Sequence, residues 1–119
     1  MDDDMAELLD AKHLPSSFTY PEAFVRVVEL GLTNLEPWWI IEGSLLRDRF
    51  AGLQQRYVTR LLVPFAQRQD NDDVACFDVD HGTVVVIHDF AAPGWEQRAE
   101  FATIYGWFRQ AIEDLIAFD

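Results

Sequence analysis

The stretch that decides the fold is Leu62–Asp80, LVPFAQRQDNDDVACFDVD. It places two apolar segments, rich in β-branched and aromatic residues, on either side of the polar run DNDD at positions 70–73. Such segments favour strands, whereas Asp and Asn favour turns because their side chains hydrogen-bond to the backbone nearby. The stretch therefore predicts two strands, over residues 61–66 and 74–79, joined by an acidic turn.

The segments on either side extend this pattern. A third strand, over residues 83–88, follows the turn signal Asp80-His81-Gly82, in which glycine supplies a positive φ. The three strands predict an antiparallel meander. Helical periodicity and an aromatic stretch after a proline predict the remaining elements. The predicted helices cover residues 5–13, 21–30, 45–57 and 98–117, and a further extended segment covers 35–43. Strands in series with helices before and after them predict an α+β domain that ends in a long helix.

Length and composition predict a single domain. The chain has 119 residues, of which 50% are hydrophobic, so it can bury one core as one domain over residues 1–119. Residues 1–4 are expected to form a flexible acidic tip. The start is acidic where a signal peptide is basic, and no apolar stretch approaches the length of a membrane span. We therefore expect a cytoplasmic protein.

The charge is strongly negative and unevenly distributed. The formal net charge of −12 disfavours binding to nucleic acid or to an anionic membrane and favours basic partners. The stretch from Gln69 to Gln97 holds seven acidic residues and no Lys or Arg, whereas Gly43 to Arg68 holds five arginines and one aspartate. Two interpretations stand side by side: a solvated face of acidic loops, and a docking surface for a basic protein.

The second interpretation names candidate partner-binding residues. The acidic ones are Asp70, Asp72, Asp73, Asp89 and Glu96. Trp95, in a Pro-Gly loop, is a candidate interface anchor, because tryptophan is enriched among residues that dominate binding energy. Packing of its ring over the edge of the sheet is an equal alternative. Trp38 and Trp39 are consecutive, so on a strand they point to opposite faces: one belongs to the core and the other is free to line a groove.

No motif predicts catalysis, a metal or a cofactor. The acidic run at 70–73 lacks the glycine and the distant glutamate of a calcium loop. His81 and His88 are separated by a whole strand, which places them too far apart to share a metal. Cys76 lies in an apolar run and is expected to be a buried, inert thiol. The weakest alternative is a small metal-dependent enzyme that uses the carboxylates between residues 70 and 89 with His88.

The order of these features resembles the SUKH superfamily, which includes the fungal cell-wall-assembly regulator domain and many small bacterial proteins. The resemblance covers the chain from about residue 14 to its end. Its most specific part is the segment VPFA…DDVACFD, within Leu62–Asp78. The other matching segments are Leu14-Pro15 with a short helix ending near Gly31, PWWII (37–41), GTVVVIHDF (82–90), PGWE (93–96) and FATIYGWF (101–108). A single glycine, Gly31, stands where longer members have a pair.

The resemblance implies helices packed around a twisted antiparallel sheet, with Pro64 to Asp78 as the fold-defining segment. It also implies a function: bacterial members are typically immunity proteins that bind a cognate toxin, often a nuclease, and they are not enzymes. The acidic charge of this chain fits a basic toxin. The alternative function is an intracellular regulatory or scaffold domain without a toxin partner, as in the fungal members. A homo-oligomer is compatible with either function.

Overall fold

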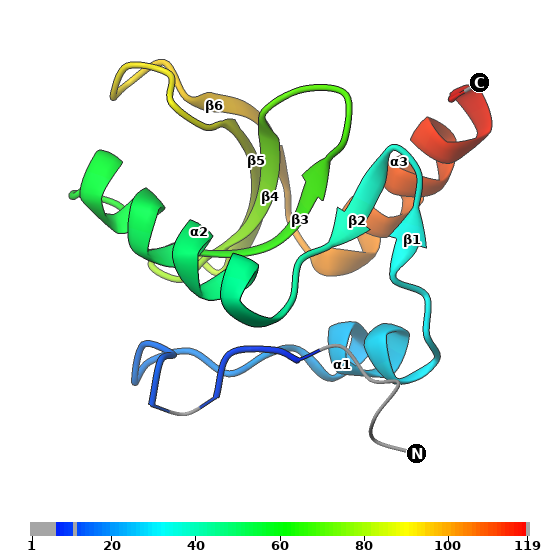
Figure 1. Ribbon diagram of the computed structural model, residues 1–119, viewed down its shortest axis with the longest axis horizontal. Coiled ribbons are helices and arrows are strands. Elements are labelled where there is room, and N and C mark those ends of the chain that lie inside the picture. Colours follow the sequence, from blue (N-terminus) through cyan, green and yellow to red (C-terminus); the bar gives the residue numbers. More distant parts are fainter. Residues whose placement is uncertain (1–6, 11, 119) are drawn as a thin grey trace.

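The computed structural model describes residues 7–10 and 12–118 and contains one six-stranded sheet with three helices (Figure 1). All neighbouring strands are antiparallel and follow the chain in the order β1-β2-β3-β4-β5-β6. The strands are β1 (Asn34–Leu35), β2 (Trp38–Ile40), β3 (Leu62–Arg68), β4 (Asp73–Asp78), β5 (Thr83–His88) and β6 (Gln97–Phe101). The helices are α1 (Glu22–Glu29), α2 (Gly43–Arg56) and α3 (Ile104–Ala117). The predicted α+β class and the antiparallel meander are confirmed.

The central hairpins form as the sequence predicts. The acidic run at 70–73 is the turn between β3 and β4, where the backbone N–H of Asp73 donates to Oδ1 of Asn71 at 2.8 Å. Gly82, with φ +67°, closes the turn between β4 and β5, a conformation that glycine adopts without steric cost. Among the described residues, no helix is long and apolar enough to cross a membrane.

The curved sheet carries α2 on one face and α1 with α3 on the other (Figure 1). Strand alternation sends Phe77 toward α1 and α3, where its ring lies 5.4 Å from that of Phe24. On the same face Phe65 lies 4.8 Å from Trp107 of α3, measured between ring centroids. The opposite face of β4 presents Cys76 and Asp78 toward α2. The buried ion pairs described below lie on this second face, beside the buried apolar side chains Leu46, Phe50 and Leu53 of α2.

Three sequence predictions are wrong in their bounds or in the type of element. The helix predicted for 98–117 begins only at Ile104, because the residues before it form β6, and at 14 residues it is no longer than α2. The extended segment 35–43 is a hairpin of β1 and β2. No helix occurs in the described part of the segment 5–13, and Met5, like the predicted tip at 1–4, lies outside the described residues.

Candidate functional site

The arginine-rich and acid-rich stretches of the sequence fold against each other on the α2 face of the sheet. At their centre the carboxylate of Asp89 is completely buried. Arg56 donates to it from both Nε and Nη2, each at 2.7 Å, and Arg49 Nη1 donates to it at 2.7 Å. Arg49 also donates to Oε1 of Gln67 on β3 at 2.9 Å. One carboxylate thus joins two turns of α2 to the end of β5.

Arg60, which follows α2, makes a second buried set of ion pairs. It donates to Glu96 at 2.8 Å and to Asp78 at 3.3 Å, and both carboxylates are buried. Asp89 and Glu96 therefore do not belong to an exposed acidic face, contrary to the expectation from the sequence. The physical reason is that a buried carboxylate needs a charged partner, and the arginines of α2 and of the segment after it supply one.

The network holds its carboxyl groups ionised. Burial alone would raise the pKa of Asp89, but hydrogen bonds from Arg56 and Arg49 outweigh it and hold that pKa below its ordinary value. Burial would likewise raise the pKa of Glu96, but hydrogen bonds, chiefly from Arg60, outweigh it and lower that pKa. For Asp78, hydrogen bonds from His81 and Arg60 outweigh burial and lower the pKa.

We therefore expect acid to destabilise this fold. A carboxyl group whose pKa is lower in the folded than in the unfolded state stabilises the protein above the unfolded pKa, and this contribution is lost as the pH falls through the folded pKa. The free energy of unfolding, from urea titrations, should not decrease from pH 7 to about 5.5, because Asp78 raises the pKa of His81, and it should decrease below about pH 4.5. A stability that does not decrease between about pH 5 and 3 would contradict the assignment of these ion pairs.

Phe90, directly after the buried Asp89, has a strained backbone. Its φ is +71°, and for a bulky residue this conformation costs about 1–3 kcal/mol. Two contacts hold it: its N–H donates to Oδ1 of Asp89 at 2.8 Å, and the Arg56 guanidinium lies 4.1 Å from the centroid of its ring. Nevertheless the side chain is 64% exposed. An apolar ring is thus presented to solvent by a buried ionic network.

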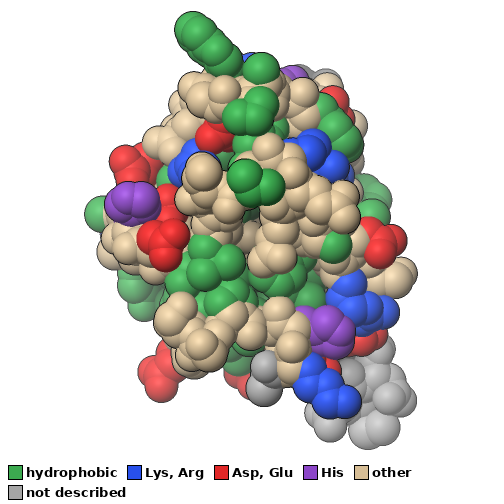
Figure 2. All heavy atoms as spheres, turned by 90° about the vertical axis from the view of Figure 1, so that its left-hand side faces the viewer, with side chains coloured by type: hydrophobic (Ala, Val, Ile, Leu, Met, Phe, Trp, Pro, Cys, Tyr) green, Lys and Arg blue, Asp and Glu red, His purple; other side chains and the backbone are tan. Residues whose placement is uncertain are grey.

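Two further exposed apolar side chains belong to the same region. Trp95 is 78% exposed and lies in the β5–β6 loop with Phe90, and Val58 is 79% exposed. Val58 follows Tyr57, whose hydroxyl donates to the carbonyl of Ala91 in that loop at 2.9 Å. We call Val58, Phe90 and Trp95 the anchor surface. Figure 2 faces this side of the molecule and shows hydrophobic side chains protruding among charged ones.

The predicted tryptophan pair behaves as expected. Trp38 is buried against Trp107, with ring centroids 5.4 Å apart, and its indole N–H donates to Asp114 at 2.9 Å. Trp39 points to the opposite face, is 49% exposed, and donates to Gln69 at 2.8 Å. The prediction that the two indoles lie on opposite faces of the strand is confirmed, and only Trp39 is accessible to a partner.

The acidic turn lies next to the β5–β6 loop, because the backbone N–H of Asp89 donates to the carbonyl of Asp72 at 3.0 Å. Asp70 accepts two hydrogen bonds from Arg68, at 2.8 and 2.9 Å, and Asp73 accepts one from His88 at 2.9 Å. Asp72 is exposed, and its carboxylate has no ion-pair partner among the described residues. Of these three carboxylates, only that of Asp70 is paired with an arginine, whereas the partner of Asp73 is a histidine and Asp72 has no ion-pair partner among the described residues.

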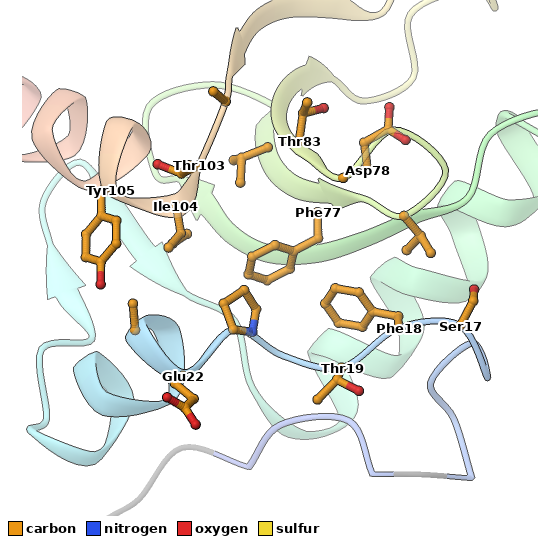
Figure 3. Close-up of a pocket in the computed structure, with 16 residues that line it drawn as sticks. Ser17, Phe18, Thr19, Glu22, Phe77, Asp78, Thr83, Thr103, Ile104 and Tyr105 are labelled. Atoms are coloured by element: carbon orange, nitrogen blue, oxygen red, sulfur yellow. The ribbon is translucent and has the colours of Figure 1, made fainter.

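A cavity of about 620 Å³ opens on the other side of the sheet, between the segment 17–23, the start of β5 and the start of α3 (Figure 3). The rings of Phe18 and Phe77 lie near its centre. Hydroxyl groups surround them, on Ser17, Thr19, Thr83 and Thr103. None of the described lining residues is basic, and the only lining carboxylates are Glu22 and Asp78, the latter bound by Arg60. The lining is that of an apolar hollow whose rim carries hydroxyl groups and the carboxylate of Glu22.

The structure separates the groups considered for metal or acid–base chemistry. His81 bonds to Asp78 at 3.0 Å, whereas His88 bonds to Asp73 at the opposite end of β5. Within residues 7–10 and 12–118, no three His, Cys, Asp or Glu side chains converge as a metal site requires. Cys76 is fully buried, as predicted, and burial raises the pKa of its thiol well above the ordinary value.

Comparison with known proteins found no family model that matches this chain, and no match among curated proteins or solved structures.

Proposed function

We propose that this chain is a non-enzymatic protein-binding domain of the SUKH type that works in the cytoplasm as an immunity protein and neutralises a cognate toxin by direct binding. The single observation that carries the protein-binding part is Phe90. A strained backbone with an exposed ring, held by a buried network, is typical of a position whose geometry serves recognition rather than stability. Trp95 in the same loop adds a second aromatic, the side-chain class that dominates binding energies.

A basic partner is supported by the charges that remain unpaired. The buried network neutralises Arg49, Arg56 and Arg60 within the chain, so they do not offset the acidic groups on the surface. The described residues give no ion-pair partner to a set of exposed carboxylates spread over the molecule, which comprises Glu22, Glu29, Glu36, Glu42, Asp48, Asp72, Asp80 and Glu113. The negative charge of these carboxylates would attract a positively charged toxin to the protein, and added salt would slow the association.

A catalytic role has less support. Within the described residues, His81 is hydrogen-bonded to Asp78, but no serine, threonine or cysteine side chain bonds to its ring. Covalent catalysis requires such a nucleophile beside its base. The regulatory-scaffold alternative shares the binding surface and differs in having no toxin partner.

The test is co-expression with the product of the open reading frame next to this gene, scored by rescue of growth and by binding. We expect co-expression to restore growth and the two proteins to co-purify. Trp95→Ala and Phe90→Ala should each weaken binding about 30-fold or more, because each removes an exposed anchor worth about 2 kcal/mol. Phe90→Gly should weaken it equally, since glycine keeps the positive φ but removes the ring.

The matched control is Tyr105→Ala. Tyr105 is also an exposed aromatic, at 58%, but it lies on α3 on the other side of the sheet. Its removal should change the affinity less than about 3-fold, as for a residue outside the interface. Rescue that survives the loss of both Phe90 and Trp95 would contradict the anchor surface. A wild-type chain that neither rescues growth nor binds would contradict the immunity function itself.

A further inference from the structure

α3 (Ile104–Ala117) carries apolar side chains on two of its faces. The face that packs against the sheet holds the buried residues Ile104, Trp107 and Ala111. A surface helix normally presents polar side chains on the side away from the core. On α3 that side instead holds four large apolar side chains that are 38–72% exposed, namely Tyr105, Ile112, Leu115 and Ile116. We call these four residues the outer stripe of α3.

The end of α1 and the segment after it extend the outer stripe. Leu30 and Leu32 are 64% and 49% exposed. Together with Tyr105 and Ile112 they line a hollow of about 430 Å³ beside α3, and Arg26 is the only charged residue among the described lining. Contiguous exposed apolar side chains with few charges among them are typical of a surface that another molecule covers.

Two opposite charges border the outer stripe. Arg109 and Glu113 are exposed and stand four residues apart on one side of α3. Neither forms an ion pair with a described residue. A cation four residues before an anion is also the less favourable order for a pair within one helix. The two charges cancel, so a second molecule with the net charge of −12 meets no local excess of negative charge here.

We propose that two copies of this chain associate through α3, with the two helices antiparallel about a two-fold axis at the level of Ala111. Such an axis brings together residues at equal distances on either side of it, on the same flank of the two helices. Arg109 of each copy then lies beside Glu113 of the other, so one interaction is made twice. The same register pairs the apolar side chains Tyr105 with Ile116, Phe108 with Leu115, and Ile112 with its own counterpart.

This self-complementarity identifies the occupant as a second copy. Apolar side chains meet apolar ones along the centre of the contact, and on its flank each arginine meets a glutamate. A basic partner would find no cluster of carboxylates on the outer stripe to attract it. The anchor surface lies on the other side of the sheet, at the α2 face, so a dimer formed through α3 leaves it open to a toxin.

The first test is the mass in solution, measured by light scattering at about 100 μM, above the micromolar range of weak interfaces. We expect about 27 kDa, twice the chain mass of 13.7 kDa. Ile112→Glu should weaken association about 30-fold or more, because it sets two carboxylates together at the axis. The matched control is Leu45→Glu, the same chemical change at a 51% exposed residue of α2, and it should leave the dimer intact.

A monomeric wild type, or an equal loss of association in both glutamate variants, would overturn the proposal. If the wild type is monomeric and Ile112→Glu weakens binding to the product of the neighbouring open reading frame, the outer stripe belongs to that partner and the dimer is again overturned.

The second test is a charge exchange. Arg109→Glu and Glu113→Arg should each weaken association about 10-fold, because each places like charges side by side twice in the dimer. The double variant R109E/E113R exchanges the two charges and keeps their pairing, so it should restore the association of the wild type. A double variant as weak as the single ones would overturn the antiparallel register.

The third test reports the register directly. Packed helices have axes about 8–10 Å apart and Cα atoms about 2.3 Å from each axis, which places the two Cα atoms of position 112 about 4.5–6 Å apart. A disulfide requires about 4.4–6.8 Å. Ile112→Cys should therefore form a linked dimer under mild oxidation, and the native Cys76 is fully buried and does not interfere.

The control for cross-linking is Gln110→Cys, at an exposed position on another side of the same helix, which should remain monomeric. Equal cross-linking of both cysteine variants, or of neither, would overturn the proposed register. The mass, charge-exchange and cross-linking measurements use this chain alone, so their failure leaves toxin binding untouched.

Discussion

Asp89→Asn is expected to lower the free energy of unfolding by about 3–5 kcal/mol, the usual cost of removing one partner from a buried ion pair. The substitution keeps the size of the side chain but removes its charge. Two guanidinium groups, on Arg49 and Arg56, would then face a neutral amide in a site from which water is largely excluded. A domain of this size has only about 5–15 kcal/mol in total, so the urea midpoint should fall by about a fifth or more.

The control for this variant is Asp72→Asn. Asp72 lies in the β3–β4 turn, and its carbonyl accepts a hydrogen bond from the backbone N–H of Asp89. Its carboxylate, however, is exposed and has no ion-pair partner among the described residues. Its loss should change the free energy of unfolding by less than about 0.5 kcal/mol, as for other surface substitutions. If the two variants were equally stable, the buried network would not be what holds α2 and the β5–β6 loop against the sheet.

The loss of stability in acid should also be smaller in Asp89→Asn than in the wild type, because one of the carboxyl groups with a lowered pKa is gone.

The sequence predicted the centre of the fold better than its edges, for a physical reason. β3, β4 and β5 are joined by short turns, so their pairing is local and their alternation is visible in the sequence. β6 was predicted as the start of a helix, because Phe101 continues the helical spacing of Ile104 and Tyr105. In the structure Phe101 pairs with Val84, a contact that no local pattern contains. Tertiary pairing overrides local preference at such a boundary.

The candidate site was predictable in its charges but not in its geometry. The opposite bias of residues 43–68 and 69–97 was visible in the sequence, and it is explained by the pairing of the two stretches with each other rather than by an acidic surface. That Arg60 would meet both Asp78 and Glu96 depends on how the sheet curves around α2. Phe90 was missed, because nothing in its sequence signals a positive φ, which glycine and asparagine adopt far more often.

Trp107→Ala is the second substitution with a large expected effect, a loss of about 3–5 kcal/mol in the free energy of unfolding. Trp107 is 1% exposed and is the largest fully buried side chain of the described core. Its ring lies 4.8 Å from Phe65 of β3 and 5.4 Å from Trp38 of β2, measured between centroids, so it joins α3 to two strands. Its removal would leave a cavity that these rigid neighbours cannot close.

The matched control is the same chemical change at Trp95, which is 78% exposed. Trp95→Ala should stay within about 0.5 kcal/mol of the wild type in urea titrations, because an exposed indole contributes little burial. The pair of variants separates two uses of one residue type, since Trp107 stabilises the fold and Trp95 is available for recognition. A large loss of stability in Trp95→Ala would mean that this indole is packed in solution, and any loss of toxin binding by that variant would then report unfolding rather than a lost contact.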